Sequence, residues 1–238
     1  KFSGRIKRTE NLIPAASKAI NLAKGGIPGP VHLAIAADTL AGDIDNGISD
    51  LKQVHKVAEN PLKPSVKLVK SIASAKKPLI IVGPFFGMPC HRDKLKKIEN
   101  QLNIPVVLME SPRGFNDPRL GNIKSMLRLA DLIIVVGKPV DFPLSYGSLE
   151  PFKKDAEWFV YIGSDALLKK ARSNLGNRLK EGKNIAPLAA IDMFEKLELK
   201  KAISSKWLSF LRKAIDCRNF FIPDKSCNQD KLNSLTFA

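Results

Sequence analysis

Short apolar runs recur along residues 79–162, and each leads into a turn that contains glycine. The runs are residues 79–82, 105–109, 132–136 and 158–162, and the turns after them begin at Gly83, Glu110, Gly137 and Gly163. Strands that are apolar at every position are buried on both faces, which is typical of a parallel sheet covered by helices. A fifth, weaker strand is expected near residues 185–186.

Between and after these runs, the apolar positions follow a helical spacing. Helices are expected at residues 65–75, 92–102, 122–130, 188–197 and 204–215. The alternation predicts an α/β fold, a doubly wound, mostly parallel Rossmann-like sheet flanked by helices. Trp207, Leu208 and Leu211 form an apolar stripe, which favours a packing face over a groove for a partner.

A separate helix and strand precede this region. The helix is expected to start at Thr9 or Asn11 and to run to about Ala23, with Pro14 tolerated in its first turn. Glycines and prolines at 25–30 end it, and residues 31–37 are expected to form a buried strand. Residues 40–64 are polar, contain proline and show little periodicity, which indicates a linker between domains.

The charge of the chain is strongly basic. The 238 residues hold 39 Lys and Arg against 23 Asp and Glu, a net charge of +16. Such an excess suits an anionic partner such as nucleic acid. However, the basic residues are dispersed, the longest runs are pairs such as Lys169-Lys170, and aromatic residues are not interleaved with them. Solvated helix faces are therefore favoured over a nucleic-acid surface.

The number of cysteines and the hydropathy of the chain bear on the cellular compartment. The three cysteines, Cys90, Cys217 and Cys227, are too few and too scattered for a disulfide framework. No apolar run reaches the roughly 18 residues that cross a bilayer, so no membrane association is expected. A reducing compartment follows, the cytoplasm or the mitochondrial matrix. The dispersed His and Cys residues show no metal-ligand spacing, and the adjacent Cys90 and His91 favour a helix start over a nucleophile and its base.

The turns after the strands form the candidate binding site. Ligands collect at the carboxyl ends of parallel strands, where helix N-termini offer N–H groups to anions. Gly83 and Gly137 would let a ligand approach the backbone, Lys138 or Arg113 could meet a phosphate, and Asp165 could meet a ribose hydroxyl. The spacing Gly-x-Gly-x-x-Gly is absent, so ordinary turn geometry is the alternative explanation for these glycines.

With these residues in view, the chain resembles thiamine-diphosphate-dependent enzymes, in particular their acetolactate synthase-like and 2-hydroxyacyl-CoA lyase-like branches. The turn and strand at residues 29–38 are similar to the element that closes the first domain of these enzymes. Residues 111–121 resemble the loop after the second strand of their central domain. Residues 130–142, continued by residues 145–147, resemble its signature of alanine-aspartate, apolar strand, glycine, basic residue and aspartate.

The resemblance implies a domain organisation. Residues 1–42 would be the C-terminal part of a pyrimidine-binding domain, 43–64 a linker, 65–200 the central domain, and 201–238 a linker into a diphosphate-binding domain. Thiamine diphosphate and Mg²⁺ would lie between the first and last of these domains. The family's activating glutamate and Gly-Asp-Gly…Asn motif are not found in the sequence. We therefore expect no catalytic residue in this chain, and neither cofactor bound by it alone.

The implied activity is that of a carbon–carbon lyase or transferase acting on 2-oxo or 2-hydroxy acids, with a 2-oxo acid or acyl-CoA substrate, in a homodimer or homotetramer. Some branches bind FAD or ADP in the central domain. There Lys138 takes the place of a basic residue that is often arginine, while Gly163 replaces the ribose-binding acid and leaves only Asp165 nearby. Two alternatives stay open: a non-catalytic relative that serves as a basic scaffold or binds RNA or an assembly, and a stand-alone nucleotide-binding domain.

Overall fold

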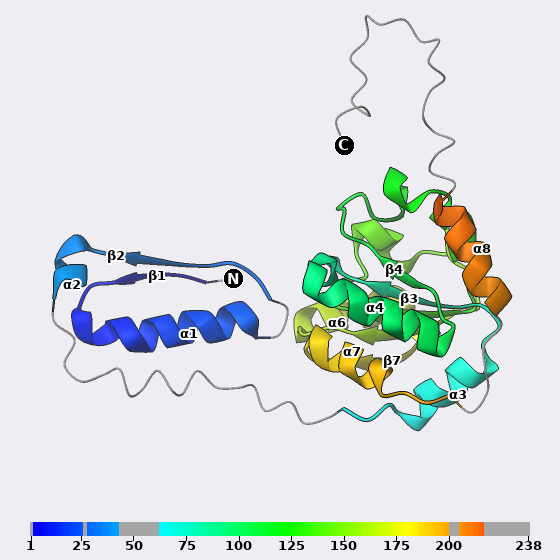
Figure 1. The fold of residues 1–238 in the computed structure, drawn as a ribbon, viewed down its shortest axis with the longest axis horizontal. Helices are drawn as coiled ribbons and strands as arrows, with labels where there is room; N and C mark the ends of the chain where they lie inside the picture. The colour runs from blue at the N-terminus through cyan, green and yellow to red at the C-terminus, as the bar shows by residue number, and fades with distance from the viewer. Residues whose placement is uncertain (1, 26–27, 43–61, 200–204, 217–238) are drawn as a thin grey trace, which may run out of the picture.

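The computed structural model describes residues 2–25, 28–42, 62–199 and 205–216 (Figure 1). Its strands are β1 (Phe2–Ile6), β2 (Val31–Ile35), β3 (Pro78–Val82), β4 (Val106–Leu108), β5 (Leu132–Val136), β6 (Glu157–Tyr161) and β7 (Leu179–Lys183). Its α-helices are α1 (Leu12–Lys24), α2 (Ala37–Ala41), α3 (Val66–Ser74), α4 (Pro89–Leu102), α5 (Ile123–Leu127), α6 (Asp165–Leu175), α7 (Pro187–Glu195) and α8 (Ser205–Asp216). Short 3-10 turns lie between them, including η3 (Pro84–Gly87), η4 (Gly114–Asn116) and η6 (Phe142–Gly147).

Five strands form a parallel sheet in the order β4-β3-β5-β6-β7. The chain leaves β3 for β4 on one side, then crosses to β5 on the other side of β3 and continues outward to β6 and β7. This confirms the doubly wound α/β fold. In such sheets the crevice for ligands lies at the carboxyl ends of the two strands where the direction of winding changes, which are β3 and β5 here.

Every residue of β3 and β5 is buried, because helices cover both faces of the sheet. On one face, the apolar side chains of α3, α4 and α7 pack against Ile80, Val82 and Ile134. On the other face, those of α5, α6 and α8 pack against Ile81 and Val135. The unbroken apolar runs in the sequence therefore reflect burial from two sides.

The helix α8 belongs to this sheet unit, although it lies beyond the expected end of the central domain at residue 200. The indole Nε1 of Trp207 donates a buried hydrogen bond of 2.7 Å to the carbonyl of Pro78, at the start of β3. Leu211 and Ala214 join the core beside α5. The expectation that Trp207, Leu208 and Leu211 form a packing face is confirmed.

The N-terminal unit is a βαβ element. β1 and β2 are parallel and paired from Phe2 with Val31 to Ile6 with Ile35, and α1 joins them. Neither β1 nor α2 was expected from the sequence. β1 reads FSGRI, which lacks an apolar run, and α2 occupies residues 37–41, where the expected strand ended and the expected linker began. Most of that linker, residues 43–61, lies outside the described residues.

The structure differs from several further expectations about the sheet unit. The fifth strand is β7 at residues 179–183, not near residues 185–186, and α6 was not expected at all. The sequence of β7 is LKEGK, which carries charges because it forms an edge of the sheet. The expected helix at 92–102 starts earlier, at Pro89, because proline is well suited to the first turn of a helix. The helix expected at 122–130 is shorter, residues 123–127.

The packing of α8 can be tested by truncating its central side chain. We expect Trp207→Ala to lower the free energy of unfolding by about 3–5 kcal/mol, since it removes a large buried side chain and its hydrogen bond. Urea unfolding followed by circular dichroism measures this change. The matched control is Phe210→Ala on the same helix, whose side chain is 50% exposed, for which a loss well under half of that is expected. Equal losses would show that α8 does not pack through Trp207.

Candidate functional site

The carboxyl ends of β3 and β5 meet at two glycines. A Cβ atom on Gly83 would clash with the carbonyl oxygen of Gly137. Gly137 itself has a φ of +64° and sits against Pro187, whose Cβ would lie 3.0 Å from an added Cβ. Both positions need glycine because backbone and helix start approach so closely, so contact within the protein already accounts for Gly83. The structure thus brings two of the expected site residues together where the winding changes.

Lys138 follows directly and is buried, with only 4% of its surface exposed. It makes no hydrogen bond or ion pair with any other residue in the described ranges. Burial lowers the pKa of Lys138 below its ordinary value, and the nearby carboxylate of Asp141 opposes this only in part. Burying a charged side chain is costly unless it is paired and hydrogen-bonded, and Asp141 gives Lys138 only a nearby countercharge. An anion at this position would supply a hydrogen-bonded partner.

The loop after Lys138 is held in a strained conformation. Asp141 has one buried carboxylate oxygen, Oδ1, without a hydrogen-bond partner in the described part of the chain. Its backbone oxygen accepts hydrogen bonds from the amides of Leu144 (2.9 Å) and Tyr146 (2.8 Å). Ser145 and Tyr146 have positive φ angles of 44° and 54°, which cost about 1–2 kcal/mol each for residues with a side chain.

The loop is braced by α6 and the turn after it. Asn174 donates a hydrogen bond of 3.0 Å to the carbonyl of Val140, and Arg178 donates one to the carbonyl of Gly147. Burial lowers the pKa of the Arg178 guanidinium, but it stays far above neutral pH, where arginine is always charged. These bonds hold the strained backbone in place, so Lys138 and Asp141 occupy fixed positions.

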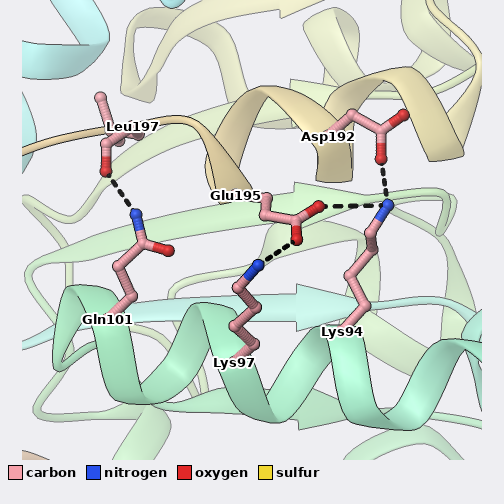
Figure 2. Close-up of polar contacts among 6 residues, drawn as sticks. All are labelled: Lys94, Lys97, Gln101, Asp192, Glu195 and Leu197. Atoms are coloured by element: carbon pink, nitrogen blue, oxygen red, sulfur yellow. Dashed lines mark hydrogen bonds and ion pairs between the residues drawn. The ribbon is translucent and has the colours of Figure 1, made fainter.

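Ion pairs join helices α4 and α7 (Figure 2). Lys94 of α4 bonds to Asp192 of α7 and lies 3.3 Å from Glu195, which also pairs with Lys97 at 2.7 Å. The hydrogen bond from Lys94 to Asp192 raises the pKa of Lys94, and bonds from Lys97 and Lys94 lower the pKa of Glu195. The middle of α4 is therefore tied to the middle and the C-terminal end of α7.

The other two expected site residues lie apart from Lys138. Arg113 is exposed after β4, at the edge of the sheet, and its side chain has no partner in the described ranges. Asp165 starts α6 after β6, and its carboxylate accepts a hydrogen bond of 2.7 Å from Asn184. No contact within the described ranges joins either side chain to Lys138.

Sequence reasoning missed a polar cluster on the other side of β3. The carboxylate of Glu110, directly beyond β4, packs so tightly on Gly87 that a Cβ there would clash with Oε1. Arg92 of α4 donates a hydrogen bond of 2.8 Å to the carbonyl of Gly87, and its Nη2 lies 3.6 Å from Glu110 Oε1. The sequence could have indicated Glu110 by its position, because it lies 27 residues after Gly83, at the end of the second strand of the sheet unit.

The described residues do not fit a metal site. No group of three or more His, Cys, Asp or Glu side chains is placed to hold a metal ion in the part of the chain that the structure describes. None of the helices in the described ranges combines the length and apolar character that a bilayer-crossing segment needs.

Comparison with known proteins gives two kinds of match. No family model matches the chain. Among curated proteins, the chain is 26% identical over 191 residues to 2-hydroxyacyl-CoA lyase 2 of Danio rerio, covering 62% of this chain and 30% of that protein. It is 25% identical to 2-hydroxyacyl-CoA lyase of Arabidopsis thaliana, over 74% of this chain and 33% of that protein. It is 24% identical to human 2-hydroxyacyl-CoA lyase 1, over 89% of this chain and 38% of that protein.

Among solved structures, the fold is similar to the thiamine diphosphate-dependent 4-hydroxybenzoylformate decarboxylase of Rhodococcus jostii. The TM-score is 0.60 at 19% identity, over 86% of this chain and 40% of that chain, which shows a common fold. The chain thus spans about a third of the length of the curated relatives that it matches. The resemblance seen in the sequence is confirmed: the chain is similar to 2-hydroxyacyl-CoA lyases in sequence and to a thiamine diphosphate-dependent decarboxylase in fold.

Proposed function

We propose that this chain supplies the central part of a thiamine-diphosphate-dependent carbon–carbon lyase or transferase, and that its own crevice holds ADP or FAD. Similarity to 2-hydroxyacyl-CoA lyases supports the first half and a 2-hydroxy or 2-oxo acid as the substrate. The observation that carries the second half is Lys138, a buried lysine that makes no hydrogen bond in the described ranges, next to Gly83 and Gly137 at the carboxyl ends of β3 and β5.

The chemistry of this crevice matches a diphosphate. Lys138 provides a point charge for a phosphate oxygen. The N-termini of α4 and α7 lie at the same edge, and helix N-termini favour anions. The ion pairs between the middle of α4 and the second half of α7 would keep the two helices side by side. In this proposal, the nucleotide offsets the cost of burying Lys138.

The role of the chain in catalysis is binding and positioning. Thiamine diphosphate supplies, when bound, the electron sink for a carbanion next to a carbonyl. The described residues contain no cluster suited to its Mg²⁺, so the proposal places that cofactor in contact with other parts of the polypeptide. We also propose a homodimer or homotetramer in the cytoplasm or mitochondrial matrix. The domain boundaries are those expected from the sequence, except that the central domain extends through α8.

A second candidate is a non-catalytic relative that acts as a basic scaffold or binds RNA. The observation in its favour is the excess of 39 basic over 23 acidic residues. The two candidates differ in ligand. A nucleotide crevice binds ADP with saturation at one site, whereas a basic surface binds RNA with an affinity that falls steeply with salt.

The lyase half is tested on the protein isolated from its natural source. We expect it to consume a 2-hydroxyacyl-CoA only when thiamine diphosphate and Mg²⁺ are present, because the cofactor carries the chemistry. Product formation followed by mass spectrometry measures this activity, and heat-treated protein is the control. A protein that binds thiamine diphosphate to saturation but does not consume the 2-hydroxyacyl-CoA would favour the second candidate, the non-catalytic scaffold.

The nucleotide half is tested by isothermal titration of the 238-residue chain with ADP. We expect binding at one site, weakened at least about tenfold by Lys138→Ala, since a charge-assisted contact is lost. Lys169→Ala, which removes an equal charge from an exposed position of α6, is the control and should keep the affinity. Equal affinities of the two variants would place the nucleotide elsewhere.

The cost of burying Lys138 predicts that removing its charge stabilises the fold. Lys138→Met is expected to raise the free energy of unfolding at pH 7 by about 0.5–2 kcal/mol, while ADP binding is lost. Because the folded chain has the lower Lys138 pKa, the penalty is full below that pKa and is relieved as pH rises toward the ordinary value of 10.5.

Urea unfolding at several pH values checks this expectation. The gain in stability from Lys138→Met should be largest at neutral pH and should shrink as the pH is raised toward 10.5, the ordinary pKa of lysine. Lys169→Met is the matched control and should change stability little at any pH. A destabilised Lys138→Met chain would show that Lys138 is paired in the folded state.

A further inference from the structure

We infer that Glu110 recognises the ribose of the bound nucleotide, so that the crevice selects nucleotides whose two ribose hydroxyls are free. This inference rests on the proposed nucleotide site and adds to it a specificity residue. It assigns this role to Glu110, which follows β4, on the opposite side of β3 from Lys138. The sequence alone had favoured Asp165.

The position of Glu110 follows from the sheet. β3 and β4 are paired, with Val82 opposite Leu108, and the amide of Met109 donates a hydrogen bond of 3.0 Å to the carbonyl of Val82. Glu110 is the next residue, beside the turn that follows β3. In nucleotide-binding sheets, an acidic residue at the end of the strand next to the first turn binds the ribose hydroxyls.

The distance between the ends of β4 and β5 allows a single ligand to contact both Glu110 and Lys138. Neighbouring strands lie about 4.8 Å apart, so the ends of β4 and β5 are separated by about 10 Å, with the end of β3 between them. A nucleoside diphosphate can extend across this edge, with its phosphates at Lys138 and its ribose at Glu110. Gly83 and Gly87 belong to the turn between these two ends, where they contact the carbonyl of Gly137 and the carboxylate of Glu110.

The carboxylate of Glu110 is available for such a contact. Its side chain is 39% exposed, and Oε1 faces Arg92 at 3.6 Å. Its Oε2 has no hydrogen-bond partner among the residues that the structure describes. A ribose diol offers two O–H donors, and a carboxylate is an acceptor that charge makes strong. Glu110 can therefore accept from the diol without losing its existing contacts.

Asp165 is less suited to this role. Its Oδ2 is engaged by Asn184 at 2.7 Å, and it belongs to α6, which follows β6. The residue closer to the end of β6 is Gly163, which has no side chain to offer. The buried oxygen of Asp141 lies near Lys138, on the side where the phosphates would be.

The same arrangement excludes a phosphate on the ribose. A phosphate at the 3′ position, as in coenzyme A, would bring negative charge against Glu110. Arg92 would compensate only in part, because its Nε bonds to the carbonyl of Gly87 and its Nη2 faces Glu110, although the side chain is 56% exposed. The crevice would thus select ADP or FAD and reject the nucleotide half of an acyl-CoA, so that acyl-CoA enters the enzyme by another surface.

The test compares three ligands by isothermal titration with the 238-residue chain: ADP, 2′-deoxy-ADP and ADP carrying a 3′-phosphate. We expect ADP to bind about tenfold more tightly than either of the others, in line with one lost hydrogen bond to a charged group. In Glu110→Gln, ADP should weaken to the level of 2′-deoxy-ADP, and the preference among the ligands should disappear. Glu150→Gln, an equal change of charge at an exposed residue, is the control.

The direction of the change separates recognition from a general field effect. Removing a negative charge would strengthen the binding of any anion if Glu110 acted only through its field, whereas recognition of the diol predicts weaker ADP binding. Should Glu110→Gln fail to fold, the preference of the unmodified chain for ADP over 2′-deoxy-ADP decides the matter. If the unmodified chain binds ADP without that preference, or if Glu110→Gln binds ADP with unchanged affinity, the inference is overturned and the proposed nucleotide site remains. If the chain binds no nucleotide, both the inference and the proposed site are overturned.

Discussion

The burial of β3 and β5 on both faces is the constraint on which the rest of the sheet unit depends. A parallel strand between two layers of helices can carry only apolar side chains, so polar chemistry has to sit at the strand ends. Gly83, Gly137 and Lys138 stand at those ends, and so does Glu110. The position of the candidate site is therefore a consequence of how the core is packed.

The sequence predicted the parts of the fold that burial controls. β3, β5 and β6 were found because their apolar runs are unbroken, and α8 because its apolar stripe faces the core. β1 and β7 were not predicted because polar residues interrupt their patterns. α6 was not predicted either, although Leu168, Ala171 and Leu175 follow a helical spacing. Edge strands carry charges for a physical reason, so periodicity alone detects them poorly.

The candidate site was predictable only where it lies on consecutive residues. Gly137 and Lys138 could be read directly, and Gly83 followed from the end of the first apolar run. The significance of Glu110 depends on β4 lying next to β3, which is a matter of strand order that one sequence does not display. Asp165 was chosen by its distance along the chain from the fourth strand, but Asn184 engages it.

The hydrogen bond between Trp207 and Pro78 has a consequence for synthesis on the ribosome. Its partners are 129 residues apart in the chain. One face of β3 therefore lacks the cover of α8 until the intervening strands and helices have been synthesised. Contacts of such long range close late and slow folding. Until then, apolar sheet surface is open to solvent and to neighbouring chains, which makes this face the natural place for a chaperone to bind the nascent chain.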